Sequence, residues 1–251
     1  MEPTPARYDP IADFYADFAS GPPTKLVDLA LLDLVGDVSG LRLLDLACGH
    51  GRFARALARR GAEVVGIDIS AALIAKARAA ENAAPLGVTY VHADAAAAHA
   101  LAGELFDGVV CGFGLSDIDD LDGALATVAR VLHSGGAFTF SLLHPCFPGW
   151  GANRNSSWPP GGYYQEGWWL LEDAPPHFLR GKVGANHRML STYLNALVRN
   201  NLRVEAAVEP PQPAEWATEA PGAAPVPVFL VARCRKSLVS DMGENSATDA
   251  V

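Results

Sequence analysis

The sequence lacks the features of a membrane-spanning or exported protein. It contains no uninterrupted apolar run of about 18 residues, the length that a membrane-spanning helix needs. The segment from Met1 to Tyr15 carries three acidic side chains and no apolar core, so no secretory signal is predicted. We therefore expect a cytoplasmic protein.

Cysteine and excess positive charge are also scarce. The four cysteines, Cys48, Cys111, Cys146 and Cys234, lie far apart, form no CxxC pair and have no histidine at the spacing of zinc ligands. Neither a disulfide framework nor a metal site is therefore predicted. The formal net charge is −9, and the lysines and arginines are scattered rather than clustered, so we expect no nucleic-acid partner.

The composition and the hydrophobic pattern predict a globular α/β protein. Half of the residues are hydrophobic and 19% are charged, which suits a packed core. From Leu41 onwards, short β-rich runs alternate with helical patterns, as in a parallel sheet covered by helices on both faces. The predicted strands are 41–46, 63–67, 88–91, 106–111, 137–142, 203–208 and 226–234. We predict a doubly wound, seven-stranded, mostly parallel sheet with five parallel strands and a last antiparallel strand.

Capping residues and glycines mark where the predicted helices begin and end. Helices are predicted at 52–59, from the capping residue Ser70 to about Asn82, at 121–132, and after Ser191 as a second capping residue. The run Ser134-Gly135-Gly136 predicts a break before the fifth strand.

The chain divides into a main domain at 37–236, an N-terminal helical cap at 1–36 and a tail at 237–251. The tail is small and polar, so it is predicted to be disordered. Between 146 and 184 the alternating pattern stops, which predicts an insertion or lid on the acceptor side. The aromatic residues of this insertion stand among glycines and prolines; they include Trp150, Trp158, Tyr163, Tyr164, Trp168 and Trp169.

Polar residues and glycines follow four successive predicted strands. Asp45, Asp68, Asp94 and the loop from Gly112 to Gly114 stand at the carboxyl ends of these strands. Ligands of open α/β sheets bind beyond these ends, so one crevice is predicted there. The turn from Asp45 to Gly51 has glycines that let the backbone approach a ligand closely.

These segments resemble the successive motifs of class I S-adenosylmethionine-dependent methyltransferases, in the right order over about a hundred residues. The matching segments are Leu43 to Leu57, Val64 to Ser70, His92 to Ala95 and Phe106 to Phe140. The resemblance implies a Rossmann-like methyltransferase fold of the small-molecule branch, S-adenosylmethionine as cofactor and S-adenosylhomocysteine as product.

The resemblance also implies which residues hold the cofactor. Asp45, Ala47, Gly49 and Gly51 would hold its methionine part, although Ala47 departs from the usual glycine. The remaining implied contacts are Asp68 and Ile69 at the ribose, Asp94 and Ala95 at the adenine, and Cys111, Gly112 and Phe113 on the sulfonium side.

The segment from Tyr8 to Tyr15 resembles the N-terminal cap that folds over the cofactor in this family. Tyr8 and Tyr15 are the expected contacts, because an aromatic face attracts a sulfonium cation. Plain helix packing is the structural alternative for both tyrosines.

The methyl acceptor is expected above the strand ends. His144 follows the fifth strand and is the first candidate for a general base, with a structural role at the strand exit as the alternative. His187 and Arg188 begin a segment that resembles one closing the acceptor pocket in a bacterial branch of small-molecule methyltransferases; a solvated helix start is the alternative. The expected aromatic cover consists of Tyr163, Tyr164, Trp168 and Trp169, unless the tryptophans form the core of the lid.

The predicted function is methyl transfer from S-adenosylmethionine to oxygen or nitrogen of a small, aromatic or hydrophobic metabolite. The alanine-rich composition, with more arginine than lysine, favours bacterial secondary metabolism. Two alternatives stay open: a nicotinamide-binding Rossmann domain, since 49–54 fits G-x-G-x-x-A, and a methyltransferase-like protein that catalyses a rearrangement or cyclisation or only binds the cofactor. Asp45 and the final hairpin argue against the nicotinamide. The sequence leaves open whether the protein is a monomer or a homodimer.

Overall fold

A computed structural model describes residues 6–19, 21–147, 161–171, 176, 178–211 and 226–237. It confirms the predicted seven-stranded sheet, with the strand order β3-β2-β1-β4-β5-β9-β8. The strands are β1 Arg42–Leu46, β2 Glu63–Asp68, β3 Thr89–His92, β4 Phe106–Gly112, β5 Leu132–Leu143, β8 Leu202–Val208 and β9 Phe229–Lys236. Strands β1 to β5 are parallel, and β9 runs antiparallel between β5 and β8.

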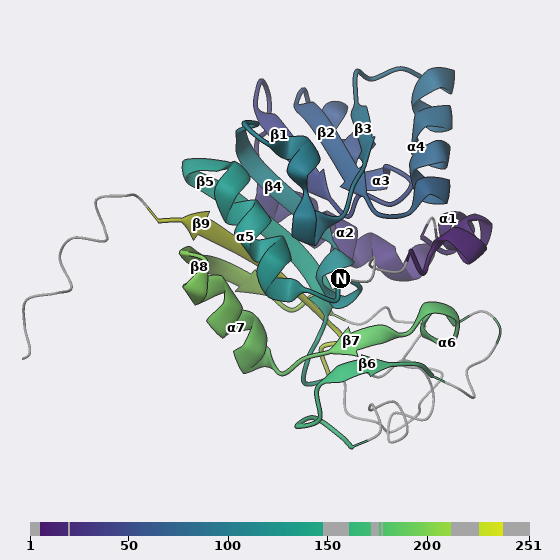
Figure 1. The fold of residues 1–251 in the computed structure, drawn as a ribbon, viewed down its shortest axis with the longest axis vertical. Helices are drawn as coiled ribbons and strands as arrows, with labels where there is room; N and C mark the ends of the chain where they lie inside the picture. Colours follow the sequence, from purple (N-terminus) through teal and green to yellow (C-terminus); the bar gives the residue numbers. More distant parts are fainter. Residues whose placement is uncertain are drawn as a thin grey trace, which may run out of the picture.

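Helices cover both faces of this sheet (Figure 1). One face carries α2 Pro22–Val35, α3 Arg52–Ala58 and α4 Ala71–Ala83, and the other carries α5 Leu121–Val131 and α7 Leu190–Arg199. Because side chains alternate along a strand, Leu43 packs in the cluster under α2 to α4, whereas Leu44 packs in the cluster under α5. This two-sided burial explains why the strands read as apolar runs.

The starts of α4 and α7 have different causes. Ser70 caps α4 as predicted, and its hydroxyl oxygen accepts a hydrogen bond from the Leu73 amide at 3.1 Å. The prediction that Ser191 caps α7 is wrong, since the helix begins at Leu190 with Met189 at the N-cap position. Side chains from the insertion take over: Glu166 accepts from the Met189 amide at 2.6 Å, and Tyr163 accepts from the Leu190 amide at 3.0 Å.

The predicted break at residues 134–136 is also wrong, because β5 continues through it from Leu132. The two glycines instead accompany a register shift in the pairing with β4, between Phe106 and Gly108. Gly135 has a φ of 75°, a conformation that glycine adopts without strain.

The N-terminal cap and the insertion meet at one side of the sheet. The cap consists of the 3₁₀ helix η1 Asp9–Ile11, α1 Ala12–Ala19 and α2, whereas the insertion carries β6 Gly167–Trp169 and α6 Arg180–Val183 and is followed directly by β7 Ala185–His187. Figure 1 shows β6 and β7 below the large sheet and α6 close to α1. The Lys182 ammonium lies 4.6 Å from the centre of the Phe14 ring, so α6 and α1 are in contact. The predictions for Trp150, Trp158 and residues 238–251 lie outside the described residues.

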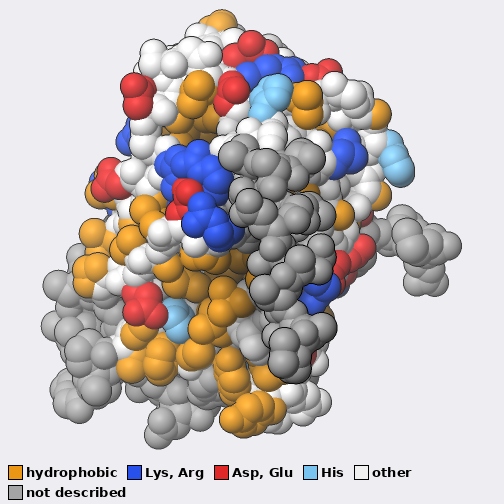
Figure 2. Space-filling model, turned by 90° about the vertical axis from the view of Figure 1, so that its left-hand side faces the viewer, with side chains coloured by type: hydrophobic (Ala, Val, Ile, Leu, Met, Phe, Trp, Pro, Cys, Tyr) orange, Lys and Arg blue, Asp and Glu red, His pale blue; other side chains and the backbone are white. Residues whose placement is uncertain are grey.

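The edge strand β8 carries a network of paired charges. Glu205 lies within 3.0 to 3.7 Å of the guanidinium groups of Arg203, Arg233 and Arg235. Figure 2 shows basic side chains gathered around acidic ones on the face that bears this edge. Charged side chains on an edge strand oppose pairing with another strand. Within the described part of the chain, none of the helices has the length and apolarity to cross a membrane.

Candidate active site

The turn between β1 and α3 has an unusual backbone. Ala47, Gly49 and Gly51 all have positive φ angles, of 57°, 56° and 85°. A methyl group at Gly51 would lie 2.2 Å from the Tyr90 hydroxyl oxygen, so a larger residue fits here only if the Tyr90 ring or the turn moves. Ala47 adopts a conformation that strains a residue with a Cβ atom, and such strain is found most often at functional sites.

Asp45 lies buried at the end of β1 with one oxygen unpaired. Its Oδ2 accepts a hydrogen bond from the Ala54 amide at 2.8 Å, whereas Oδ1 has no hydrogen-bond partner among the described residues. Burial raises the pKa of Asp45 to about 8. A buried acceptor without a donor costs stability, so this carboxyl group suits a ligand that brings a donor or a positive charge.

Asp68 connects the end of β2 to the glycine turn. Its two oxygens accept hydrogen bonds from the Gly49 and Ser70 amides, each at 2.8 Å. Burial raises the pKa of Asp68 to about 6 in spite of these bonds, which favour the charged form. The carbonyl of Ile69 accepts from His92 Nε2 at 2.8 Å.

The ends of β3 and β4 lie at the same edge of the sheet as those of β1 and β2, and we call this shared edge the crevice. Asp94 Oδ1 accepts from the Ala96 amide at 2.9 Å and caps the short helix η2 Ala95–Ala97, in which Ala95 is buried. Cys111 and Gly112 end β4, and a methyl group at Gly112 would lie 2.1 Å from the Phe53 ring. Phe113 has a φ of 65°, a second strained position beside this crevice.

Tyr8 and Tyr15 lie over the glycine turn. A methyl group at Gly49 would lie 3.2 Å from Tyr15 Cε1, and the Tyr15 and Tyr8 rings meet edge to face at 4.9 Å. Burial raises the pKa of both phenols. The Tyr8 hydroxyl donates to Asp117 Oδ2 at 2.9 Å.

Asp117 and Arg180 join this cluster, although the sequence did not point to them. Asp117 follows the 3₁₀ helix η4 Gly114–Ser116, and its Oδ1 accepts a hydrogen bond from Arg180 on α6. Burial lowers the pKa of Arg180, but the Asp117 carboxylate outweighs burial and raises it above the usual value. The three acidic residues between Asp117 and Asp120 could have pointed to Asp117, whereas no local sequence pattern marks Arg180.

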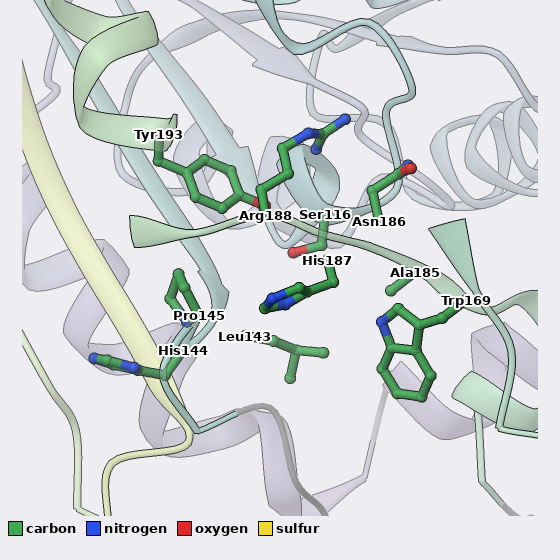
Figure 3. Close-up of a pocket in the computed structure, with 10 residues that line it drawn as sticks. All are labelled: Ser116, Leu143, His144, Pro145, Trp169, Ala185, Asn186, His187, Arg188 and Tyr193. Atoms are coloured by element: carbon green, nitrogen blue, oxygen red, sulfur yellow. The ribbon is translucent and has the colours of Figure 1, made fainter. Parts of the chain in front are cut away.

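A small pocket, partly open to solvent, lies beside this cluster (Figure 3). It is lined by Ser116, Leu143, His144, Pro145, Trp169, Ala185, Asn186, His187, Arg188 and Tyr193. Three residues predicted to hold the acceptor, His144, His187 and Arg188, are therefore brought together. Of the predicted aromatic cover, Trp169 lines the pocket, whereas Tyr163, Tyr164 and Trp168 do not. Tyr164 is 85% exposed and Trp168 is 46% exposed.

The two histidines differ in orientation and hydrogen bonding. His187 Nε2 lies 2.8 Å from the Tyr163 carbonyl oxygen. A carbonyl only accepts, so Nε2 of the neutral ring carries the hydrogen and Nδ1 carries the lone pair. His144 Nδ1 accepts from the Cys146 amide at 3.1 Å, and its Nε2 lies 2.8 Å from Glu209. Figure 3 shows the His144 ring pointing away from the other labelled side chains.

Arg188 holds the segment that follows β4. Its guanidinium donates to the carbonyls of Leu115, Ile118 and Asp119 at 2.9, 2.6 and 2.8 Å. Arg188 and His187 are both buried, so the alternative of a solvated helix start does not hold. The segment from 115 to 119 is consequently a shared wall, with Ser116 in the pocket and Asp117 in the tyrosine cluster.

The fold and the site define a Rossmann-like α/β protein that binds a ligand at the carboxyl ends of its strands. Residues 44–140 match the family model described as a methyltransferase domain. A solved structure of an S-adenosylmethionine-dependent methyltransferase from Mesorhizobium loti is 31% identical, covers 86% of this chain and 99% of its own, and has a TM-score of 0.65. The chain belongs to the S-adenosylmethionine-dependent methyltransferase family.

Two relatives of known name align with part of the chain. The ubiquinone biosynthesis O-methyltransferase of Alkalilimnicola ehrlichii is 36% identical over 110 residues, which are 44% of each chain. The demethylmenaquinone methyltransferase of Thermobifida fusca is 36% identical over 138 residues, 51% of this chain and 58% of its own. The chain thus spans about half the length of these relatives.

Proposed function

We propose that the protein transfers a methyl group from S-adenosylmethionine to oxygen or nitrogen of a small, aromatic or hydrophobic acceptor. The observation that carries this proposal is the position of the pocket around His187, which shares the segment from 115 to 119 with the tyrosine cluster over the glycine turn. As working boundaries we take 1–36 as the cap, 37–236 as the methyltransferase domain and 146–184 as the acceptor-side insertion.

The residues of the crevice fit the cofactor. Asp45 Oδ1, which has no hydrogen-bond partner among the described residues, suits the ammonium of the methionine part. It lies beside the positive-φ turn from Ala47 to Gly51. Asp68 has oxygens with lone pairs left for the ribose hydroxyls, and Asp94 with Ala95 stands at the adenine end. When bound, the cofactor supplies a methyl group on a sulfonium that is open to in-line displacement.

The cover and the sulfonium side come from other elements. Cys111, Gly112 and Phe113 end β4 beside the turn, where Gly112 leaves room for Phe53. Tyr8 and Tyr15 cover the turn and exclude water from it, and their ring faces favour a neighbouring cation.

The pocket suits an oxygenated aromatic ring. Leu143, Pro145 and Trp169 offer apolar walls, and the Nδ1 lone pair of His187 can take the proton that the acceptor loses. Positioning alone supplies much of the rate of such a displacement, so the remaining walls matter as much as the base. The names of the relatives, which refer to ubiquinone and demethylmenaquinone, support a ring-shaped acceptor. We propose bacterial secondary metabolism as the source of the acceptor.

Calorimetric titration tests the cofactor, with S-adenosylmethionine, S-adenosylhomocysteine, NADH and NADPH as ligands. We expect binding of the first two alone, at micromolar affinity. Binding of a nicotinamide, or of neither pair, would overturn the proposal. In a second step, phenolic and amine acceptors are screened, and the formation of S-adenosylhomocysteine is measured for each.

The same screen separates methyl transfer from cyclisation. A methyltransferase consumes one cofactor for each product, whereas a cyclase or rearrangement catalyst with this fold leaves the cofactor unchanged. A protein that only binds the cofactor forms no product.

A further inference from the structure

A single nitrogen of Arg180 contacts both the tyrosine cluster and the segment that leads into the acceptor pocket. Its Nη1 donates to Asp117 Oδ1 and, at 2.8 Å, to the carbonyl oxygen of Gly184. The other oxygen of the same Asp117 carboxylate accepts from Tyr8 on the cap, at 2.9 Å. One carboxylate therefore joins the cap over the glycine turn to a helix of the insertion.

Gly184 leads directly into the wall of the acceptor pocket. It precedes β7, whose residues Ala185, Asn186 and His187 line that pocket. Gly184 has a φ of 64°, and a methyl group there would lie 2.3 Å from the Trp169 carbonyl oxygen. The place of Arg180 and the place of the pocket wall are consequently tied together.

Further contacts join the cap to the insertion outside this cluster. The Arg7 guanidinium lies 5.3 Å from the centre of the Trp168 ring and pairs with both oxygens of Asp119, at 2.9 and 3.0 Å. Asn186 Nδ2 donates to the same Asp119 at 2.9 Å. Together with the contact of Lys182 and Phe14, these pairs make the cap and the insertion one continuous cover.

Burial makes the link at Arg180 unlike a surface ion pair. Arg180 is 9% exposed, and the Asp117 side chain is 22% exposed. Removing one partner leaves the other charge with little water to solvate it, so such pairs are costly to break. By contrast, the pair of Arg199 and Asp122 is more than half exposed on both sides.

We propose that Arg180 is a positioning residue that couples closure of the cap over the cofactor to the shape of the acceptor pocket. Binding of the cofactor under Tyr8 and Tyr15 then fixes the position of the Asp117 carboxylate. This carboxylate in turn fixes the position of Arg180, which holds Gly184 before the start of β7. Coupling of this kind is reciprocal, so an acceptor in the pocket tightens cofactor binding by the same factor. This inference rests on the proposed cofactor site.

The first test is titration of S-adenosylhomocysteine into the whole protein and its variants. We expect R180Q to weaken binding of S-adenosylhomocysteine by about tenfold, which is within the range of typical coupling energies. This loss is informative because Arg180 belongs to the acceptor-side insertion. R180K keeps the charge and should fall between R180Q and the natural protein. The matched control is R199Q, whose affinity should be unchanged.

A double-mutant cycle shows whether Asp117 carries the effect. Tyr8 and Arg180 bind opposite oxygens of one carboxylate, so the Y8F and R180Q losses should not multiply in the double variant. Multiplication of the two losses would mean that they act independently and would contradict the coupling.

Hydrogen exchange provides a readout that simple destabilisation does not mimic. S-adenosylhomocysteine should slow exchange of the amides in β6 and β7, and this protection should be absent in R180Q and reduced in Y8F. Y8F removes only one hydroxyl and keeps the test valid if R180Q folds poorly. With an acceptor in hand, R180Q should raise KM for the acceptor more than it lowers kcat.

The outcomes separate the inference from the proposed function. If the natural protein does not bind S-adenosylhomocysteine, the proposed function and the inference both fail. If it binds, but R180Q and Y8F bind equally well and protect β6 and β7 to the same extent, the inference alone is overturned.

Discussion

At the scale of single residues, the crevice depends on two buried carboxyl groups with different hydrogen bonding. Asp68 uses both oxygens to hold backbone amides, whereas Asp45 leaves one oxygen without a partner among the described residues. The first arrangement fixes the turn, and we propose that a bound ligand completes the second. Both carboxyl groups should therefore affect cofactor affinity, for separate reasons.

Replacing Asp68 by alanine should weaken binding of S-adenosylhomocysteine by about 1.5 kcal/mol or more, since it removes acceptors for the ribose hydroxyls and for the Gly49 amide. Calorimetry measures this loss directly. Asp122→Ala, on an exposed side chain, serves as the control. Undiminished affinity of the Asp68 variant would exclude its role at the ribose.

The two histidines should respond differently to replacement by glutamine. His187→Gln should keep its affinity for S-adenosylhomocysteine but lose about 10²- to 10⁴-fold in turnover, because the group that takes the proton is gone. The measurement is the rate of methylation with the acceptor from the screen. Turnover equal to that of the natural protein would remove His187 from the mechanism.

His144→Gln should retain most of the turnover and lose stability instead. The His144 ring joins Glu209 to the turn at Cys146 and points away from the other side chains that line the pocket, so its loss breaks two hydrogen bonds of about 1 kcal/mol each. Thermal unfolding monitored by circular dichroism measures this loss. A collapse of turnover without any loss of stability would restore His144 as the base.

At the scale of elements, the turn between β1 and α3 depends on glycine for two separable reasons. Gly51 and Gly87 have the same φ of 85°, but a methyl group at Gly51 would overlap Tyr90, whereas nothing lies within 4 Å of one at Gly87. The pair therefore separates backbone strain from steric overlap.

We expect Gly87→Ala to lower the free energy of unfolding by about 1 kcal/mol, which is the cost of strain alone. Gly51→Ala should cost about 2 kcal/mol more, because the Tyr90 ring or the turn has to move. Urea denaturation measures both values. Equal losses would show that Tyr90 yields without cost.

At the scale of the whole molecule, the buried carboxyl groups tie stability to pH. Burial raises the pKa of Asp45 to about 8 and that of Asp68 to about 6, so the folded chain binds protons that the unfolded chain has released. Their contribution is fully present below pH 3.8 and is lost as pH rises through the folded values. Burial lowers the pKa of His50, which acts in the opposite sense, but only near and below 6.5.

Between pH 7 and 8, the stability of the ligand-free protein should fall by about 1 kcal/mol, mainly through Asp45. Affinity for S-adenosylhomocysteine should rise over the same range, because its ammonium favours the charged carboxyl group. Thermal melts at several pH values, with and without ligand, measure both effects. Asp45→Asn should flatten both dependences, and an unchanged slope in that variant would assign them to another group.

What could be predicted from the sequence is what local chemistry decides. Apolar runs define the strands of a sheet buried on both faces, Ser70 caps α4, and the acids at the ends of parallel strands are brought to one edge by the topology. The glycines of the turn from Asp45 to Gly51 are likewise visible in the sequence, although Asp68 and Tyr90 fix the geometry of that turn from other strands. These features follow from spacings of a few residues, which the sequence displays.

Only the tertiary structure decided how side chains from distant segments meet. Arg180 and Asp117 are 63 residues apart, and no periodicity relates them. His187 and Trp169 line the pocket and Trp168 does not, whereas the His144 ring points away from the other side chains of the pocket. Glu166 and Tyr163, from a distant segment, accept hydrogen bonds from the amides at the start of α7. These contacts override the local capping signal at Ser191. The sequence thus determined the sheet and its crevice, whereas long-range packing decided the acceptor side, because the energies there belong to contacts between segments.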